Sequence, residues 1–377
     1  MAVIVKEIDE NGFRAMAKEW QCCLEQSDAN ALFMGWPWLY SWWEVWSGSL
    51  GLDLLLLGVY DENDQLVGIG PFYQRDLVTP LGFRVRRLHL IGSAWHIAPT
   101  VRTEYCGLIL SNERAGEACS ALMDTIASWN WDEWVLCDVV KHEVNLLEKY
   151  ARNLSDRTVR VFRGLDDGVV INTSGEFGQW LAKLGRNTRL KAYNRRNYLS
   201  QRGNFELAER DSSQAGKFLS QLNEFHLMRW GKPAFDPDAV RFHRLFMARL
   251  PACGGRVYCS ELRFDGTCVS VLYDVGIGGQ RFNLQSGYLE HFDKRVALGS
   301  LHLGFAIEDA FRDPETVRYD LLAGGGKHQY YKHHFKGSHV QFHTLQVVRN
   351  PLLRRVYRTQ ELLPDRWRRS INRWFKL

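Results

Sequence analysis

The sequence predicts an α/β (α+β) protein with two domains, and three observations lead to this class. The chain has 377 residues, more than one ordinary hydrophobic core accommodates. Its content of 45% hydrophobic and 24% charged residues is typical of a chain that folds throughout. The expected elements also follow the same order twice: helix, hairpin, strands, helix, strand. We therefore predict domains at 1–165 and 166–350, followed by a basic tail at 351–377.

The first half begins with an aromatic helix. Residues 33–46 read FMGWPWLYSWWEVW, in which Trp and Leu recur at helical spacing after Pro37, a residue suited to a first turn. Aromatic stripes can stack on sugar rings, but at helical spacing we interpret this one as core. Apolar runs at 52–60 and 66–73 flank the turn-rich DENDQ and predict a hairpin. The remaining expected elements are strands at 87–91, 105–110 and 133–139 and a helix at 113–128.

The second half repeats this order. Runs at 255–264 and 267–276 surround Asp265-Gly266 and predict a second hairpin. A strand at 280–289 precedes a helix at 296–311 that opens with Leu-Gly-Ser. The other expected elements are helices at 177–202, 213–229 and 242–250, a strand beginning at Val317, and a closing strand at 340–348.

Residues 320–337, DLLAGGGKHQYYKHHFKG, combine a strand end, a glycine turn and a cationic aromatic helix. Open α/β sheets bind ligands at the carboxyl ends of strands, and three glycines allow the backbone to approach a ligand closely. Lysines beside two tyrosines favour a phosphate-bearing substrate. The alternative is a flexible loop followed by a solvated basic helix.

Cysteine spacing and hydropathy indicate which kinds of site and which cellular location to expect. The eight cysteines form no C-x-x-C pair and no zinc-type spacing with histidine, so we expect reduced packing thiols and no metal site. No stretch of about eighteen uncharged apolar residues occurs, which leads us to expect a cytoplasmic protein. The net charge is +5, yet residues 183–202 hold seven Lys or Arg and no acid. Nothing resembles a helix-turn-helix, so DNA is not an expected partner.

Several of these segments, in their order, resemble the CelD-like acyltransferases of bacterial polysaccharide clusters. These are relatives of the Fem peptidyltransferases with an acetyltransferase (GNAT) fold. The resemblance runs over most of the chain and implies two tandem GNAT-like lobes, each a mixed sheet flanked by helices. It also implies that acetyl-CoA or another acyl-CoA binds the second lobe. The segments that carry it are Trp36-Pro37-Trp38-Leu39, the hairpin with Gly70-Pro71, the basic helix at 184–203, Phe225-His226 with Arg229-Trp230, and Tyr319-Asp320-Leu321-Leu322 leading to Tyr331-Lys332.

A GNAT lobe holds the pantetheine of its donor between two splayed parallel strands and the pyrophosphate on amides at the next helix start. The resemblance assigns these roles to the strand that contains Leu284 and Ser286, and to Arg295, Gly299 and Ser300. The hexapeptide from Arg295 to Ser300 matches the usual Gly-rich motif approximately.

Acyl transfer needs a base for the acceptor and an acid for the leaving thiolate. The resemblance implies Tyr331 as the acid, with Tyr330 second. Candidate bases are Glu290 and His291 at the end of the donor strand, and Asp320 at the end of its neighbour. Asp320 could instead cap the Gly324 amides, and His291 could be a solvated loop residue.

The acceptor side offers further candidates. His226, Arg229 and Trp230 share one helix face and could line an acceptor cleft, although ordinary packing of this group is equally compatible. Lys332 and Lys336 resemble lysines of the family motif that would hold phosphate or carboxylate groups.

The basic segment leaves two interpretations open. Arg189 and Arg196 could bind a nucleotide sugar, a lipid pyrophosphate or a tRNA acceptor stem, or they could lie on a solvated helix face. In the tail, four arginines accompany Trp367, Ile371 and Trp374 at helical spacing, as in an interfacial helix. We expect either peripheral contact with the inner face of the membrane or docking onto the second lobe.

The leading hypothesis is transfer of acetyl from acetyl-CoA to an amine or hydroxyl of a small molecule or glycan precursor in exopolysaccharide or cellulose biosynthesis. The pathway is implied by the resemblance. One alternative is a Fem-like transferase that uses aminoacyl-tRNA. Another is a catalytically silent accessory protein of polysaccharide synthesis.

Overall fold

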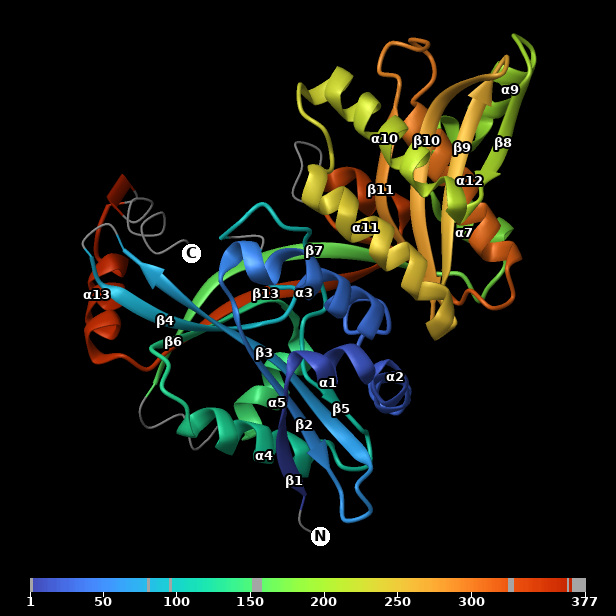
Figure 1. The fold of residues 1–377 in the computed structure, drawn as a ribbon. Coiled ribbons are helices and arrows are strands. Elements are labelled where there is room, and N and C mark those ends of the chain that lie inside the picture. The colour runs from blue at the N-terminus through green and yellow to red at the C-terminus, as the bar shows by residue number, and fades with distance from the viewer. Residues whose placement is uncertain are drawn as a thin grey trace. The chain divides into compact units, whose positions relative to one another are not determined.

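The computed structural model divides into two compact units, shown in Figure 1. Unit 1 comprises Met1–Asp166 and Gln341–Leu377, and unit 2 comprises Asp167–Val340. Residues 341–350, which the sequence analysis grouped with the second domain, belong to unit 1 in this division. The residues that the structure describes are 3–79, 82–94, 97–150, 158–324, 329–364 and 366–367.

Unit 1 is built on a mixed sheet with the strand order β1-β2-β3-β4-β6-β13. All neighbours in it are antiparallel except β4 and β6, which pair in parallel through Arg87↔Glu133 and Leu88↔Trp134. The short β5 pairs with β3. The elements are β1 (Ile4–Ile8), α1 (Glu10–Ala15), α2 (Ala17–Glu25), α3 (Trp36–Leu50), β2 (Asp53–Tyr60), β3 (Leu66–Val78), β4 (Arg84–Leu90), β5 (Ile109–Leu110), α4 (Ala115–Ser128), β6 (Glu133–Val140), α5 (Lys141–Tyr150), β13 (Ser338–Val348) and α13 (Pro351–Glu361).

Unit 2 is built on a second mixed sheet, with the order β8-β9-β10-β11-β12-β7. Here β11 and β12 are the parallel pair, and the other neighbours are antiparallel. Its strands are β7 (Val159–Asn172), β8 (Phe205–Arg210), β9 (Arg256–Phe264), β10 (Thr267–Ile277), β11 (Gln280–Tyr288) and β12 (Arg318–Ala323). Its helices are α7 (Phe177–Lys183), α8 (Arg186–Arg189), the π-helix η1 (Leu190–Asn194), α9 (Arg195–Ser200), α10 (Ala215–Trp230), α11 (Pro237–Arg249), α12 (Leu298–Arg312) and the 3₁₀ segments η2 (Ser212–Gln214), η3 (Leu250–Cys253) and η4 (Gln329–Phe335).

Helices cover both faces of the unit 2 sheet, because successive side chains of β10 point to opposite sides. Leu272 packs in a core cluster with Leu303 of α12. Tyr273 contacts Phe218 of α10 and His243 of α11. Helices α10 and α11 therefore lie on one face and α12 on the other, as Figure 1 shows.

The two units repeat one topology. In each, four antiparallel strands lead through a helix, α4 or α12, to a parallel neighbour, and an antiparallel strand then closes the sheet. A non-glycine residue with positive φ lies near the end of each parallel neighbour: Asp138 (φ 53°) in β6 and Leu322 (φ 58°) in β12. The two closing strands differ in their place along the chain. Strand β13, which closes the unit 1 sheet, follows unit 2 in sequence, whereas β7, which closes the unit 2 sheet, precedes the other strands of that unit. The repeat confirms the α+β class predicted from the order of elements.

The local predictions agree with the structure where periodicity or turn chemistry is strong. Asp265 and Gly266 have φ of 46° and 78°, as expected for the two-residue turn between β9 and β10. The aromatic stripe of α3 is core, because Trp38, Trp42 and their neighbours are at most a few per cent exposed. The expected strand at 105–110 reduces to β5, and the expected helix at 177–202 is interrupted around a π-helical turn.

Candidate active site

The parallel strands β11 and β12 part after three residue pairs. Their pairing runs from Gln280↔Arg318 to Phe282↔Asp320, and β11 then continues to Tyr288 without β12 beside it. On its other side, β11 pairs with β10 through Asn283↔Asp274 and Gln285↔Tyr273, which leaves Leu284 as an extra residue. This β-bulge re-aims the backbone at the point where the strands separate. We call the opening between β11 and β12 beyond Phe282 the strand gap.

Ser286 faces the strand gap. In an antiparallel pair, the N–H and C=O of one residue point to the same edge of the strand. The Ser286 N–H donates to Oε1 of Gln285 at 3.0 Å, and the Ser286 carbonyl lies 2.9 Å from Nε2 of His226. Side chains rather than strand β10 thus bond both groups, which places them at the edge next to the gap.

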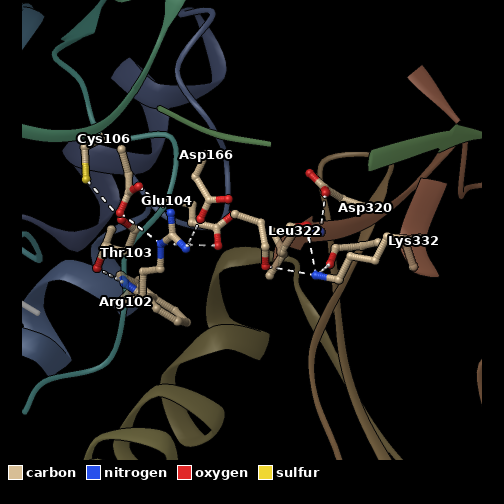
Figure 2. A network of polar contacts seen from close by, with 12 residues as sticks. Arg102, Thr103, Glu104, Cys106, Asp166, Asp320, Leu322 and Lys332 are labelled. Carbon is tan, nitrogen blue, oxygen red and sulfur yellow. Dashed lines mark hydrogen bonds and ion pairs between the residues drawn. The ribbon is translucent and has the colours of Figure 1, made fainter. Parts of the chain in front are cut away.

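The end of β12 is held by a buried acid and a buried base (Figure 2). Asp320, fully buried, accepts a hydrogen bond from the Leu322 N–H at 2.7 Å. Nζ of Lys332, which is 9% exposed, donates to the carbonyls of Leu321, Leu322 and Ala323 at 2.5, 2.9 and 2.9 Å. A leucine at φ 58° is strained, and these bonds hold it there. The geometry therefore indicates that Asp320 and Lys332 shape the strand gap.

The start of α12 lies directly after β11 in the chain and has no side-chain cap. Ala297 occupies the N-cap position, so the first amides of α12 receive no hydrogen bond from a capping side chain. Such amides, with the helix dipole, favour an anion. A Cβ atom on Gly299 would lie 2.6 Å from the Tyr288 ring, so glycine is needed for this helix start to meet the end of β11.

An arginine cluster surrounds Tyr198 and includes the residue predicted for phosphate binding. The guanidinium groups of Arg195, Arg202 and Arg295 lie 5.7, 5.2 and 5.7 Å from the Tyr198 ring centre. Asp293 accepts hydrogen bonds from the Tyr198 hydroxyl at 3.0 Å and from the Arg295 N–H at 2.6 Å. The Arg295 N–H contributes most to holding the pKa of Asp293 below its usual value. Three cations and one carboxylate thus gather just ahead of α12.

The predicted acceptor residues meet at the end of β11. Besides the His226 contact with Ser286, the Arg229 guanidinium lies 4.6 Å from the ring centres of both Trp230 and Tyr288. Nε of Arg229 is 3.7 Å from Oε1 of Glu290. Burial lowers the pKa of His226, a shift that the bond to Ser286 opposes in part. The structure therefore brings together five of the residues that the sequence singled out.

Other predicted residues lie apart from this group or are committed elsewhere. Arg196 pairs with Glu308 and lies 3.5 Å from the Phe305 ring centre. Arg189 donates to the Ala182 carbonyl at 3.0 Å. His291 and Lys336 are exposed.

The prediction of Tyr331 as the acid remains a prediction. The side chains of Tyr330 and Tyr331 lie outside the part of the chain that the structure describes, as do residues 325–328.

Sequence analysis missed Tyr198, Arg202 and Asp293 as site residues. The basic run at 183–202 was a signal for two of the arginines. Tyr198 joins them to Asp293, which lies 95 residues further along the chain, and no local pattern reveals such a contact.

Unit 1 also has a residue with positive φ near the end of its parallel strand, but different side chains surround it. Asp138, which has positive φ, accepts hydrogen bonds from Nε and Nη2 of Arg102 at 3.0 and 2.6 Å, and Nη1 of Arg102 donates to Asp166 at 2.8 Å (Figure 2). Thr103, next to Arg102, packs against Gly92. A Cβ atom on Gly92 would lie 2.7 Å from the Thr103 hydroxyl oxygen. Among the described residues, no group of His, Cys, Asp and Glu side chains in either unit could hold a metal ion.

Comparisons with known proteins place this geometry in a fold class. Residues 186–333, all within unit 2, match the family model of the acetyltransferase (GNAT) domain. The crystal structure of FemX is similar over 94% of this chain and 99% of its own, with a TM-score of 0.62 and 10% identity. A conserved protein of unknown function from Bacteroides thetaiotaomicron VPI-5482 is similar over 92% and 99%, with a TM-score of 0.56 and 10% identity. No curated protein matches the sequence.

Unit 2 therefore has the fold of the GNAT domain, and unit 1 repeats its strand order. The chain as a whole has the fold seen in FemX, which confirms the predicted fold class. At 10% identity these likenesses concern the fold alone.

Proposed function

We propose that the protein is an acyltransferase that binds acetyl-CoA or another acyl-CoA in unit 2. One observation carries the proposal: β11 and β12 part at Phe282 and Asp320, and a bulge at Leu284 turns backbone polar groups toward the opening. An extended pantetheine arm has amides that can bond to such a strand edge. Leu284 and Ser286 would contact it.

The phosphates of the donor would lie at the start of α12. The uncapped amides around Gly299 and Ser300 would take the pyrophosphate, and the arginine cluster would bind the remaining negative charge. Arg295 belongs to that cluster and is exposed, so it is free to reorient toward a ligand.

In the reaction, a lone pair of an acceptor amine or hydroxyl attacks the thioester carbonyl, the C–S bond breaks, and the thiolate takes up a proton. We assign Tyr331 as the acid that supplies this proton. Trp230, which is 47% exposed, and Arg229 would border the acceptor.

The acceptor class rests on the CelD-like resemblance. We propose a small molecule or glycan precursor of exopolysaccharide or cellulose synthesis, and an exposed cation such as Lys336 suits a phosphate or carboxylate on it. Aminoacyl-tRNA as donor, and a non-catalytic accessory role, are the competing functions.

We further propose a cytoplasmic location with peripheral membrane contact through the tail. Residues 351–377 contain eight Lys or Arg and two acids, a surplus larger than the net charge of the whole chain. The inner face of α13 packs on unit 1 through Leu353 and Tyr357, while Leu352 and Leu362 are 63% and 86% exposed. No helix in the described part of the chain is long and apolar enough to cross a membrane.

Calorimetric titration with acetyl-CoA tests the proposed donor. Arg202→Ala together with Arg295→Ala should weaken binding about 100-fold or more, because each charge-assisted hydrogen bond contributes about 1.5–3 kcal/mol. Arg244→Ala removes an exposed arginine of α11 and is the matched control. Salt-sensitive tRNA binding without any acetyl-CoA binding would instead favour the aminoacyl-tRNA function.

A further inference from the structure

A histidine at the edge of the strand gap has the geometry of a proton acceptor. We propose that His226 is the general base of unit 2, with Nδ1 as the atom that takes the proton of the acceptor. The inference rests on the proposed function, because it needs a thioester in the strand gap.

The contact with Ser286 fixes the tautomer of the ring. A carbonyl oxygen can only accept, so Nε2, 2.9 Å from the Ser286 carbonyl, carries the hydrogen. The neutral ring then has its lone pair on Nδ1. Nδ1 bonds to no described residue and is not a buried atom, so it is open to an incoming acceptor.

Close packing of α10 on β11 brings His226 next to the strand. A Cβ atom on Gly287 would lie 3.1 Å from Cβ of Phe225 and 3.2 Å from the Leu222 carbonyl. A larger residue there would push α10 away from the strand. Glycine at this position therefore lets α10 deliver the imidazole to Ser286, two residues beyond the bulge at Leu284.

The other candidate bases are less well placed in the described part of the chain. Asp320 is fully buried and bonds to the Leu322 N–H. Glu290 is about half exposed and lies beside Arg229. His291 is exposed.

Burial keeps His226 neutral near pH 7. Burial and the Arg229 charge both lower its pKa, and Glu290, 3.7 Å from Arg229, partly screens that charge. A neutral imidazole can accept a proton over the pH range in which most enzymes work.

The step balances as follows. The acceptor lone pair forms a bond to the thioester carbonyl carbon while Nδ1 takes the acceptor proton. The tetrahedral intermediate expels the coenzyme A thiolate, which is protonated by the acid. The imidazolium returns its proton to solvent, and the acid regains one from solvent. No oxidant or metal is required.

The test compares two variants of His226 with the wild-type protein. Gln in place of His226 can still donate to the Ser286 carbonyl but cannot accept a proton, and Ala leaves space for free imidazole. His142→Asn, on the exposed side of α5 in unit 1, is the control. The readouts are acetyl-CoA affinity by calorimetry, thiol release with D-glucosamine and with water as acceptor probes, and ¹⁵N NMR of the imidazoles.

We expect His226→Gln to bind acetyl-CoA with an affinity within about twofold of wild type. Its rate of thiol release should be at least about 100-fold lower, and its pH profile should lack the ascending limb. Imidazole should restore part of the rate of His226→Ala. NMR should show the Nε2–H tautomer with a pKa below 6.5. A wild-type rate and pH limb in His226→Gln, or an Nδ1–H tautomer, would overturn the inference alone. Wild-type protein that binds no acetyl-CoA would overturn the proposed function and this inference with it.

Discussion

Replacement of Lys332 should affect both the stability of the protein and the affinity of the strand gap for acetyl-CoA. The residue is nine-tenths buried, and its ammonium donates to three consecutive carbonyls at the end of β12. Lys332→Met retains most of the side-chain volume and removes the charge. Three carbonyls then lose their donor at a site where Leu322 is already strained.

The magnitude follows from these contacts. A buried polar group left without its partner costs about 1–3 kcal/mol. Three such groups set an upper limit of about 9 kcal/mol, and both water entry and the recovered desolvation cost of the ammonium reduce it. We expect the free energy of unfolding to fall by about 2–4 kcal/mol.

Urea denaturation followed by circular dichroism measures this change. The control, Lys336→Met, removes an exposed lysine four residues away and should shift the midpoint little. Acetyl-CoA affinity should fall for Lys332→Met even where the variant is fully folded, because the wall of the strand gap has moved. A Lys332→Met midpoint equal to that of Lys336→Met would refute the reasoning.

Three further predictions concern other parts of the molecule. Burial raises the pKa of Glu143 to about 7, so the folded state disfavours the carboxylate; the destabilisation is absent below pH 4.5 and complete above pH 7. Glu143→Gln should therefore raise stability by about 3 kcal/mol at pH 8 and by little at pH 4.5 in urea titrations at the two pH values, and an equal gain at both would contradict this. Gly299→Ala should weaken acetyl-CoA binding about tenfold in calorimetry, since its Cβ would collide with the Tyr288 ring and displace the start of α12; unchanged affinity would count against a phosphate site there. Deletion of residues 366–377 should abolish sedimentation with phosphatidylglycerol vesicles while phosphatidylcholine vesicles bind neither form, and equal binding before and after deletion would exclude the tail as the contact.

Much of the architecture was readable because it depends on local chemistry. Asp265-Gly266 can adopt the positive φ of a tight hairpin, and Pro37 starts a helix whose aromatic stripe must be buried. The order of β11, α12 and β12 also followed from the sequence.

Other elements gave weak signals. Strand β8, FELAER, is mostly exposed or half-buried and lacks a clear apolar alternation. Strand β1, at the edge of the unit 1 sheet, is likewise exposed or half-buried along its length. Such strands are specified by their neighbours rather than by their own pattern.

The site itself was predictable in its residue types more than in its contacts. His226 and Arg229 were named from their shared helix face, but the bond from His226 to Ser286 joins residues 60 positions apart. Lys332 was expected to hold a ligand, and it instead bonds to the backbone of β12 in this structure. The sequence does not distinguish a lysine that bonds to backbone carbonyls from one that binds a phosphate.

Hydrogen exchange measured by mass spectrometry with and without acetyl-CoA reports directly on whether the strand gap of unit 2 binds an acyl-CoA. Binding in the strand gap should slow exchange in peptides that cover 284–288 and 298–301, with no change in the matching strands β4 and β6 of unit 1. Protection confined to unit 1, or no protection in either unit at saturating acetyl-CoA, would contradict it.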